Sequence, residues 1–95
     1  MMKVDLITLK QLRALAAVAR CGSITAAAEA LHLTPPAVHS QIKGLEGATA
    51  ATLLQRTADS AGSRLTPAGE AMLRAAGRVD VALSQAVAAV RAIES

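Results

Sequence analysis

The sequence has no Phe, Trp or Tyr, a single cysteine and no long uninterrupted apolar run. Without aromatic rings the core has to be built from Leu, Ile, Val, Met and Ala, which suits helices that approach closely. The lone Cys21 excludes an internal disulfide and is typical of a reducing compartment. No stretch reaches the roughly 18 apolar residues of a membrane span, and charges interrupt the N-terminus, so no signal peptide is predicted. These absences predict a soluble, cytoplasmic domain.

Residues that could support catalysis or metal binding are also scarce. No carboxylate pair and no nucleophile with a neighbouring base lie at working distance by sequence, so an enzyme is not predicted. Cys21, His32 and His39 match no zinc spacing, so neither a metal nor another cofactor is expected. The 95 residues suffice for one small domain, with a formal net charge of +3. This mild basic excess is compatible with nucleic acid without establishing it.

The first two predicted helices are short and rich in alanine. Thr8 is positioned to cap the first, over residues 9–20, and Gly22 ends it. The apolar face of this helix carries Leu9, Leu12, Leu15, Ala16 and Ala19. Ser23 caps the second helix. Its apolar face carries Ile24, Ala27, Ala28 and Leu31.

A double proline starts the third predicted helix instead of breaking one. Thr34 caps it, and Pro35 and Pro36 fall in its first turn, where a missing N–H costs little. Its core face carries Val38, Ile42 and Leu45. The opposite face carries His39, Ser40 and Lys43. A three-residue connection before it, at 31–33, gives a helix-turn-helix, whose second helix can enter the DNA major groove and meet a phosphate with free N–H groups. The same shape also serves as plain helix packing in other domains.

The second half of the chain reads as a hairpin followed by a long helix. From Gly47 to Ser63 the helical period is lost, and extended pieces at 53–56 and 64–66 flank the loop TADSAGS. Thr66 and Pro67 open a last helix. Its apolar stripe is Met72, Ala76, Val79, Leu83, Ala86, Val90 and Ile93. Because residues 67–94 would reach about 40 Å, more than a small domain covers, the stripe predicts a partner helix, most simply from a second copy.

Three segments, taken in order, resemble the LysR-type bacterial transcriptional regulators. The stretch GSITAAAEALHLTPPAVHSQIKGLE is similar to the family's helix-turn-helix pattern, LLQR at 53–56 to its Leu-Phe-x-Arg, and LTPAGEAML to its Leu-Thr-x-x-Gly segment. The similarity covers about residues 9–69, and the helix beyond resembles the family's linker helix. The segments ITLKQLRALAAVAR and LTPPAV resemble the sequences of the carbon-fixation branch of the family.

The resemblance implies a mainly α fold, a winged helix-turn-helix with a small two-stranded wing and a long C-terminal linker and dimerisation helix. Residues 1–65 would form the DNA-binding domain and residues 66–95 the linker, with the family's effector-binding domain absent. It implies sequence-specific binding to double-stranded operator DNA as a homodimer, and a higher oligomer for a full-length chain, without a small-molecule site or membrane contact. The alternative is a helix-mediated interaction module that sequesters a related regulator.

The resemblance also assigns residues to roles. It implies that the bases and the backbone of the DNA are contacted by Thr34, Pro35, Pro36, His39 and Ser40. Further DNA contacts, mainly to phosphates, fall to Ser23, Thr25, Lys43, Arg56 and Arg64, although each of these basic side chains could also be a solvated surface charge. The dimer interface falls to the stripe from Met72 to Ile93. His32, in the turn, is expected to be structural.

Several positions depart from the family pattern. Pro35 stands where Gln is common, His39 where Ser is common, and Ser40 where Arg is frequent. Losing the Gln and Arg removes side chains that make bidentate base contacts, so apolar contacts to thymine methyl groups are expected instead. In the wing, Asp59 stands where a basic residue is common, and Arg64 is expected to supply the contact. Before the wing, residues 49–50 are Thr and Ala where Leu and Gly are typical.

Overall fold

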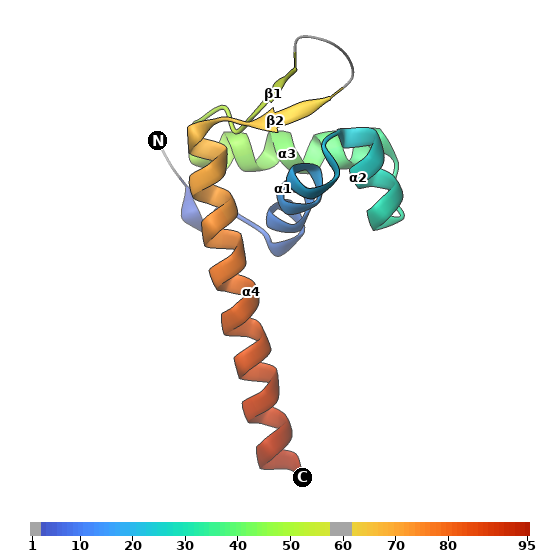
Figure 1. Cartoon of the computed structure of the whole chain (residues 1–95). Coiled ribbons are helices and arrows are strands. Elements are labelled where there is room, and N and C mark those ends of the chain that lie inside the picture. Colours follow the sequence, from blue (N-terminus) through green and yellow to red (C-terminus); the bar gives the residue numbers. More distant parts are fainter. Residues whose placement is uncertain (1–2, 58–61) are drawn as a thin grey trace.

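Three helices and a two-stranded wing lie at one end of a long fourth helix in the computed structural model of the chain (Figure 1). The structure describes residues 3–57 and 62–95, so Asp59 and most of the predicted hairpin tip lie outside the described residues. In chain order the elements are η1 (Val4–Leu6), α1 (Leu9–Cys21), α2 (Ile24–Leu31), α3 (Pro35–Thr49), β1 (Leu54–Arg56), β2 (Ser63–Leu65) and α4 (Pro67–Glu94). The expected winged helix-turn-helix is therefore confirmed.

The four predicted helix caps are all present. Thr8 forms a capping box with Gln11: its Oγ1 accepts from the Gln11 N–H at 3.1 Å, and Gln11 Oε1 accepts from the Thr8 N–H at 3.0 Å. The remaining caps each accept from the third residue of their helix, at 3.1 Å for Ser23, 3.3 Å for Thr34 and 3.0 Å for Thr66. Each cap satisfies an N–H that has no partner within its own helix.

The core is formed by α1, α2 and α3 with Leu53 from the base of the wing and Ala76 from α4. Its largest fully buried side chains are Leu15, Val18, Val38, Leu45 and Leu53. Ala27 and Ala28, which were predicted on the apolar face of α2, are fully buried, so small side chains lie where the helices pack together.

The predicted buried face of α1 is only partly correct. Ala19 is exposed and Ala16 is half-buried, whereas Ala14, Ala17 and Val18 are buried. The reason is that α1 contacts α2, α3, α4 and β2, so it is covered on more than one side and its buried surface is wider than a single stripe. The spacing of leucines alone did not reveal those additional contacts.

The prediction that helix ends at Gly47 is wrong, because α3 continues to Thr49. Ala48 and Thr49 are buried, and the Thr49 hydroxyl donates to the Leu45 carbonyl at 2.9 Å. The helix ends at Ala50, whose φ of 55° places it in the left-handed region. The turn at residues 49–50 therefore forms with an alanine at a conformation that favours glycine.

The wing is antiparallel, with Leu54 opposite Leu65 and Arg56 opposite Ser63. Each strand differs by one residue from its predicted bounds, because the Leu53 N–H donates to Glu46 Oε2 at 2.8 Å and Thr66 caps α4. The Thr66 N–H still donates to the Leu53 carbonyl at 3.0 Å. At the other end, the Ser63 N–H donates to the carbonyl of Gly22 at 2.9 Å. The wing is thus attached directly to the turn between α1 and α2.

Only the first turns of α4 pack on the domain. Met72 and Ala76 lie against the core, and an ion pair of 3.9 Å joins Arg13 of α1 to Asp80. From Gly77 onward every residue of α4 is exposed. Among the described residues no single helix is long and apolar enough to cross a membrane; α1 and α2 pass that test only together, and they are bent by 118° at their junction.

We predict that Ala50→Gly will stabilise the protein. An alanine in the left-handed region is strained, and relieving that strain outweighs the extra unfolded-state entropy of glycine, so the free energy of unfolding should rise by about 0.5–1 kcal/mol. Ala71→Gly makes the same chemical change at an exposed helical position of α4 and should lower stability by a similar amount. Urea unfolding of both variants measures the two signs; a loss of stability in Ala50→Gly would contradict the prediction.

Candidate nucleic-acid interface

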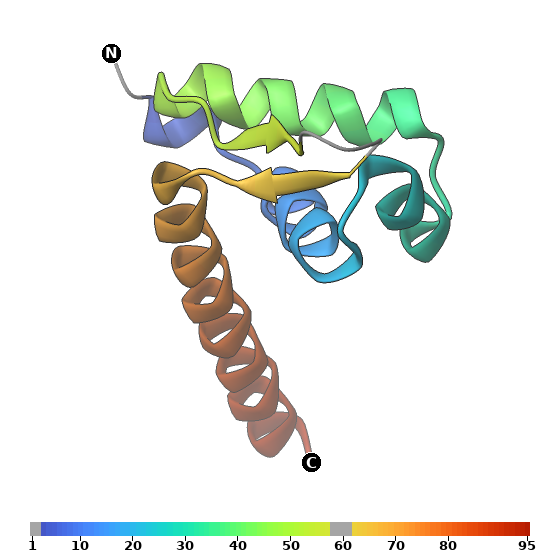
Figure 2. The ribbon, with the colours of Figure 1, turned by 45° about the horizontal axis from the view of Figure 1, so that its top comes forward.

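The outward face of α3 is exposed. Val38 is fully buried, and this orients the first turns of the helix. The residues predicted to contact DNA from this segment are all exposed: Thr34, Pro35, Pro36, His39 and Ser40. Figure 2 shows the two strands of the wing running alongside α3, so the helix and the wing present neighbouring surfaces.

Two adjoining grooves join this face to α2 and the wing. One is lined by Ile24, Thr25, Pro35, Pro36, His39, Arg56 and Ser63. The other continues along α3 and is lined by Ile24, His39, Ile42, Lys43, Glu46, Leu54, Gln55, Arg56 and Ser63. The structure therefore brings six of the predicted DNA-contacting residues together. Four others, Ser23, Thr34, Ser40 and Arg64, line neither groove.

The wing presents its two arginines differently. Both Arg56 and Arg64 are exposed. Arg56 pairs with Ser63 and lines both grooves, whereas Arg64 pairs with Gln55 on the neighbouring rung of the ladder. Because successive residues of a strand project to opposite faces, Arg56 and Arg64 project to opposite faces of the wing. Gln55 lines the groove along α3 and is exposed, although the sequence did not indicate a role for it.

The start of α3 does not offer the free N–H groups expected from the sequence. Pro35 and Pro36 have no N–H, and the next two N–H groups, of Ala37 and Val38, donate to Thr34. The expectation that this helix end binds a phosphate through its backbone is therefore wrong. The start of α2 differs, because the N–H groups of Ile24 and Thr25 have no hydrogen-bond partner among the described residues.

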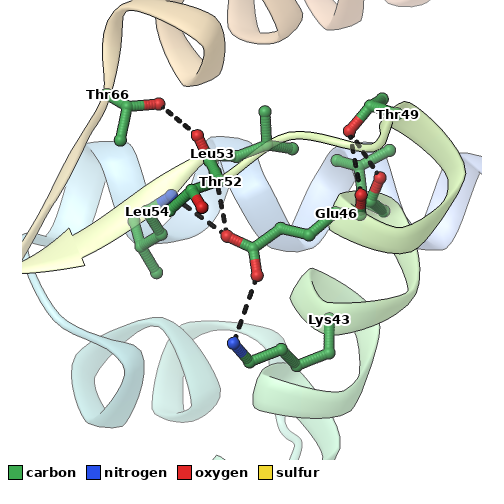
Figure 3. A network of polar contacts seen from close by, with 8 residues as sticks. Lys43, Glu46, Thr49, Thr52, Leu53, Leu54 and Thr66 are labelled. Carbon is green, nitrogen blue, oxygen red and sulfur yellow. Dashed lines mark hydrogen bonds and ion pairs between the residues drawn. The ribbon is translucent and has the colours of Figure 1, made fainter. Parts of the chain in front are cut away.

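Lys43 is paired with a carboxylate that the sequence analysis did not identify. Its Nζ lies 3.3 Å from Glu46 Oε1, and the Lys43 side chain is 64% exposed whereas that of Glu46 is 13% exposed. Glu46 Oε2 accepts from the N–H groups of Leu53 at 2.8 Å and Leu54 at 3.4 Å (Figure 3). A signal was present in the sequence: an acid near the end of a helix is disfavoured by the helix dipole and needs a partner elsewhere.

The predicted interface stripe of α4 divides into two parts. Met72 and Ala76 pack on the core of their own domain. The other members, Val79, Leu83, Ala86, Val90 and Ile93, are exposed. An apolar groove runs beside the start of the stripe and is lined by residues of η1, α1, their connection and α4: Val4, Ile7, Thr8, Leu9, Leu12, Met72, Ala75, Val79 and Leu83.

No metal-binding cluster of three or more His, Cys, Asp or Glu side chains occurs within residues 3–57 and 62–95. His32 occupies the turn between α2 and α3 and ends α2 with a φ of 57°, in the left-handed region. Cys21 is half-buried at the end of α1 and packs against the core. Of these candidate ligands, His39 alone lines the grooves of the interface.

Residues 9–70 match the family model of the bacterial regulatory helix-turn-helix proteins of the lysR family. The chain is 50% identical over 93 residues to the HTH-type transcriptional regulator CbbR of Cereibacter sphaeroides, covering 98% of this chain and 30% of that protein. It is 40% identical over 88 residues to CbbR of Xanthobacter flavus, covering 93% of this chain and 26% of that protein. The chain thus spans less than a third of the length of these relatives.

The fold is similar to solved DNA-binding domains. The domain of CbnR in a complex with DNA superposes with a TM-score of 0.85 and 33% identity, over 93% of this chain and 99% of that chain. The domain of BenM, in a complex with catB site 1 DNA, superposes with a TM-score of 0.83 and 31% identity, over 93% of this chain and 96% of that chain.

Proposed function

We propose that this chain, which belongs to the LysR family of bacterial helix-turn-helix regulators, binds double-stranded operator DNA as a homodimer. Its function is that of the DNA-binding domain of a LysR-type transcriptional regulator. The groove shared by α2, α3 and the wing carries the proposal, because it gathers exposed residues of all three elements beside the free face of α3. The sequestering alternative is not favoured, since the similar proteins are transcriptional regulators and the similar structures include DNA complexes.

The similarity to two CbbR proteins supports placing the chain in the carbon-fixation branch. We further propose that the chain works in the cytoplasm without catalytic activity, with residues 1–65 as the DNA-binding unit and residues 66–95 as the linker and dimerisation helix. A full-length chain would form a higher oligomer. The domain itself needs no cofactor in this role, because base edges and phosphates are recognised by side chains and backbone groups.

Phosphate contacts are assigned to the two sides of the groove. On one side, the start of α2 offers the Thr25 hydroxyl and two N–H groups that have no partner within residues 3–57 and 62–95, at the positive end of the helix dipole. Ser23 uses its side-chain oxygen to cap α2, so any DNA contact from it would come from the hydroxyl proton. On the other side, Arg56 and Lys43 supply positive charge, and Arg64 supplies it from the second face of the wing.

Base contacts are assigned to the exposed face of α3. Thr34, Pro35 and Pro36 present methyl and ring carbons, which suits apolar contacts to thymine methyl groups. His39 and Ser40 each offer a single hydrogen-bonding group at a time in place of a bidentate side chain. His39 also lines both grooves, so we assign it the largest share of the hydrogen-bonded base reading.

Dimerisation is assigned to the exposed part of the α4 stripe, namely Val79, Leu83, Ala86, Val90 and Ile93. Met72 and Ala76 would support it from within the domain, by fixing the direction in which α4 leaves the core. Two copies paired through α4 would present two α3 helices to the two halves of a dyad-symmetric operator.

Operator binding should weaken steeply with salt if phosphates supply much of the affinity. The logarithm of the association constant should fall against log salt with a slope of about −0.9 for each phosphate contact. Arg56→Gln should flatten the slope by about 1.8, because a dimer loses two contacts. Arg78→Gln, on an outward face of α4, removes the same charge far from the groove and should leave the slope unchanged. Fluorescence anisotropy at several salt concentrations measures the slopes; salt-independent binding by the unmodified chain would refute the proposed function.

His39→Ala should change the preference among operator variants while leaving the fold intact, because His39 is exposed beside the groove. Losing one base contact should reduce discrimination at one position by roughly 5–150-fold, as expected for about 1–3 kcal/mol. His32→Asn removes the other histidine at a left-handed position that Asn tolerates, and should not alter preference. Selection from a randomised operator library measures both; identical preferences for His39→Ala and the unmodified chain would make His39 a solvated residue only.

Leu83→Asp should separate the proposed dimer. Introducing a charge and removing a leucine from both copies should raise the dimer dissociation constant by more than about 100-fold. Val81→Asp provides the matched control, since Val81 is 58% exposed and lies with Arg74 and Arg78 on another face of α4. Sedimentation analysis of both variants tests the interface, and a Leu83→Asp protein that remains dimeric would contradict it.

A further inference from the structure

The carboxylate of Glu46 contacts both α3, which we call the reading helix because base contacts are assigned to it, and the base of the wing. Glu46 belongs to α3, and its Oε1 pairs with Lys43 in the preceding turn at 3.3 Å. Its Oε2 reaches across to the segment that enters β1 and accepts the Leu53 N–H at 2.8 Å and, more weakly, the Leu54 N–H at 3.4 Å (Figure 3). A single side chain therefore connects a residue of the groove to the first residues of the wing.

Leu53, whose N–H donates to Glu46, is also held through its side chain and its carbonyl. The Leu53 side chain is fully buried in the core, and its carbonyl accepts the Thr66 N–H at 3.0 Å, where β2 passes into α4. Gly69 lies so close to the same carbonyl that any added Cβ would collide with it. Thr66 also donates its hydroxyl to the Thr52 carbonyl at 2.6 Å. The wing thus leaves the domain from an anchored point, and Glu46 is the part of that anchor that belongs to α3.

The position of Glu46 in α3 indicates that its contacts with the base of the wing are not incidental. A carboxylate near the C-terminal end of a helix meets the negative end of the helix dipole, which disfavours it. The cost is offset by two N–H donors and one ammonium group, and the side chain is largely covered. Without an acceptor there, the N–H of Leu53 would lose its hydrogen bond in a half-buried position, where such a loss is costly.

We propose that Glu46 is a positioning residue for DNA binding, which fixes the wing relative to α3 so that Arg56 can act together with the reading helix. The inference rests on the proposed function, because it concerns the geometry of the same site. Arg56 lies two residues beyond Leu54 on the anchored strand, and it lines the same groove as Lys43 and His39. A wing released from Glu46 would keep Arg56 but lose its alignment with the helix.

The test is a double-mutant cycle between Glu46 and Arg56, read by operator binding. Glu46→Met keeps the length of the side chain and a good helix former, but removes the acceptor. In the unmodified background Arg56→Gln should weaken binding about 5-fold and flatten the salt slope by about 1.8. In the Glu46→Met background the same change should cost less than about 2-fold, because a misplaced Arg56 contributes little.

Two further variants separate the hydrogen bond from the charge. Glu46→Gln keeps an oxygen that can accept from Leu53, so the full effect of Arg56→Gln should return, while Lys43 gains freedom to pair with phosphate. Glu29→Ala removes the same charge from an exposed position of α2 and should leave the Arg56 effect at about 5-fold. Thermal unfolding of every variant confirms that binding is measured on folded protein.

If Glu46→Met is too unstable to assay, Glu46→Asp replaces it in the cycle. Aspartate keeps the charge but withdraws the carboxylate by one methylene, so the Arg56 effect should again fall below about 2-fold. An Arg56→Gln effect of undiminished size in the assayed variant would overturn the positioning role and leave the proposed function standing. Failure of the unmodified chain to bind operator DNA in a salt-dependent way would instead refute the proposed function.

Discussion

The placement of the helices, the wing and α4 depends on the backbone and side chain of Leu53. Its N–H is held by Glu46, its carbonyl by Thr66, and its side chain by the core. The start of α4 can come this close only because residue 69 is glycine. The domain has no aromatic residue to fill the junction between these elements, so backbone hydrogen bonds and close approach take over what a large side chain often does.

The parts of the fold that could be predicted from the sequence are those set by local chemistry. A hydroxyl before a helix and a proline in its first turn act within three residues, and for that reason the starts of α1, α2, α3 and α4 were predicted correctly. The end of α3 depends on burial of Ala48 and Thr49 and on a strained Ala50, which are tertiary effects. The wide buried surface of α1 likewise requires knowing that four elements surround it.

The same distinction between local and tertiary effects applies to the candidate site. Resemblance to a family located the exposed residues of α3 and the basic residues of the wing, because those positions follow from the motif. It could not reveal that the two prolines and the cap leave the start of α3 without a free N–H, since this requires the hydrogen-bond partners of residues 37–38. For Glu46 the helix dipole signals that the carboxylate needs a partner, but the partner could not be predicted, because Leu53 and Leu54 offer backbone N–H groups that carry no signature in side-chain identity.

The exposed length of α4 links helix stability to assembly. Beyond Ala76 the helix has no core to pack on, and the ion pair between Arg13 and Asp80 is exposed and contributes little. Most helical stability in proteins comes from packing of an apolar face, and this part of α4 lacks such packing within its own domain. Ile93, 80% exposed, and the valines and leucine before it gain most by pairing with an equivalent stripe. We therefore infer that ordering of the outer half of α4 and formation of the proposed dimer occur together. Protein concentration would then govern both the helix content of the chain and the two-site contact with an operator.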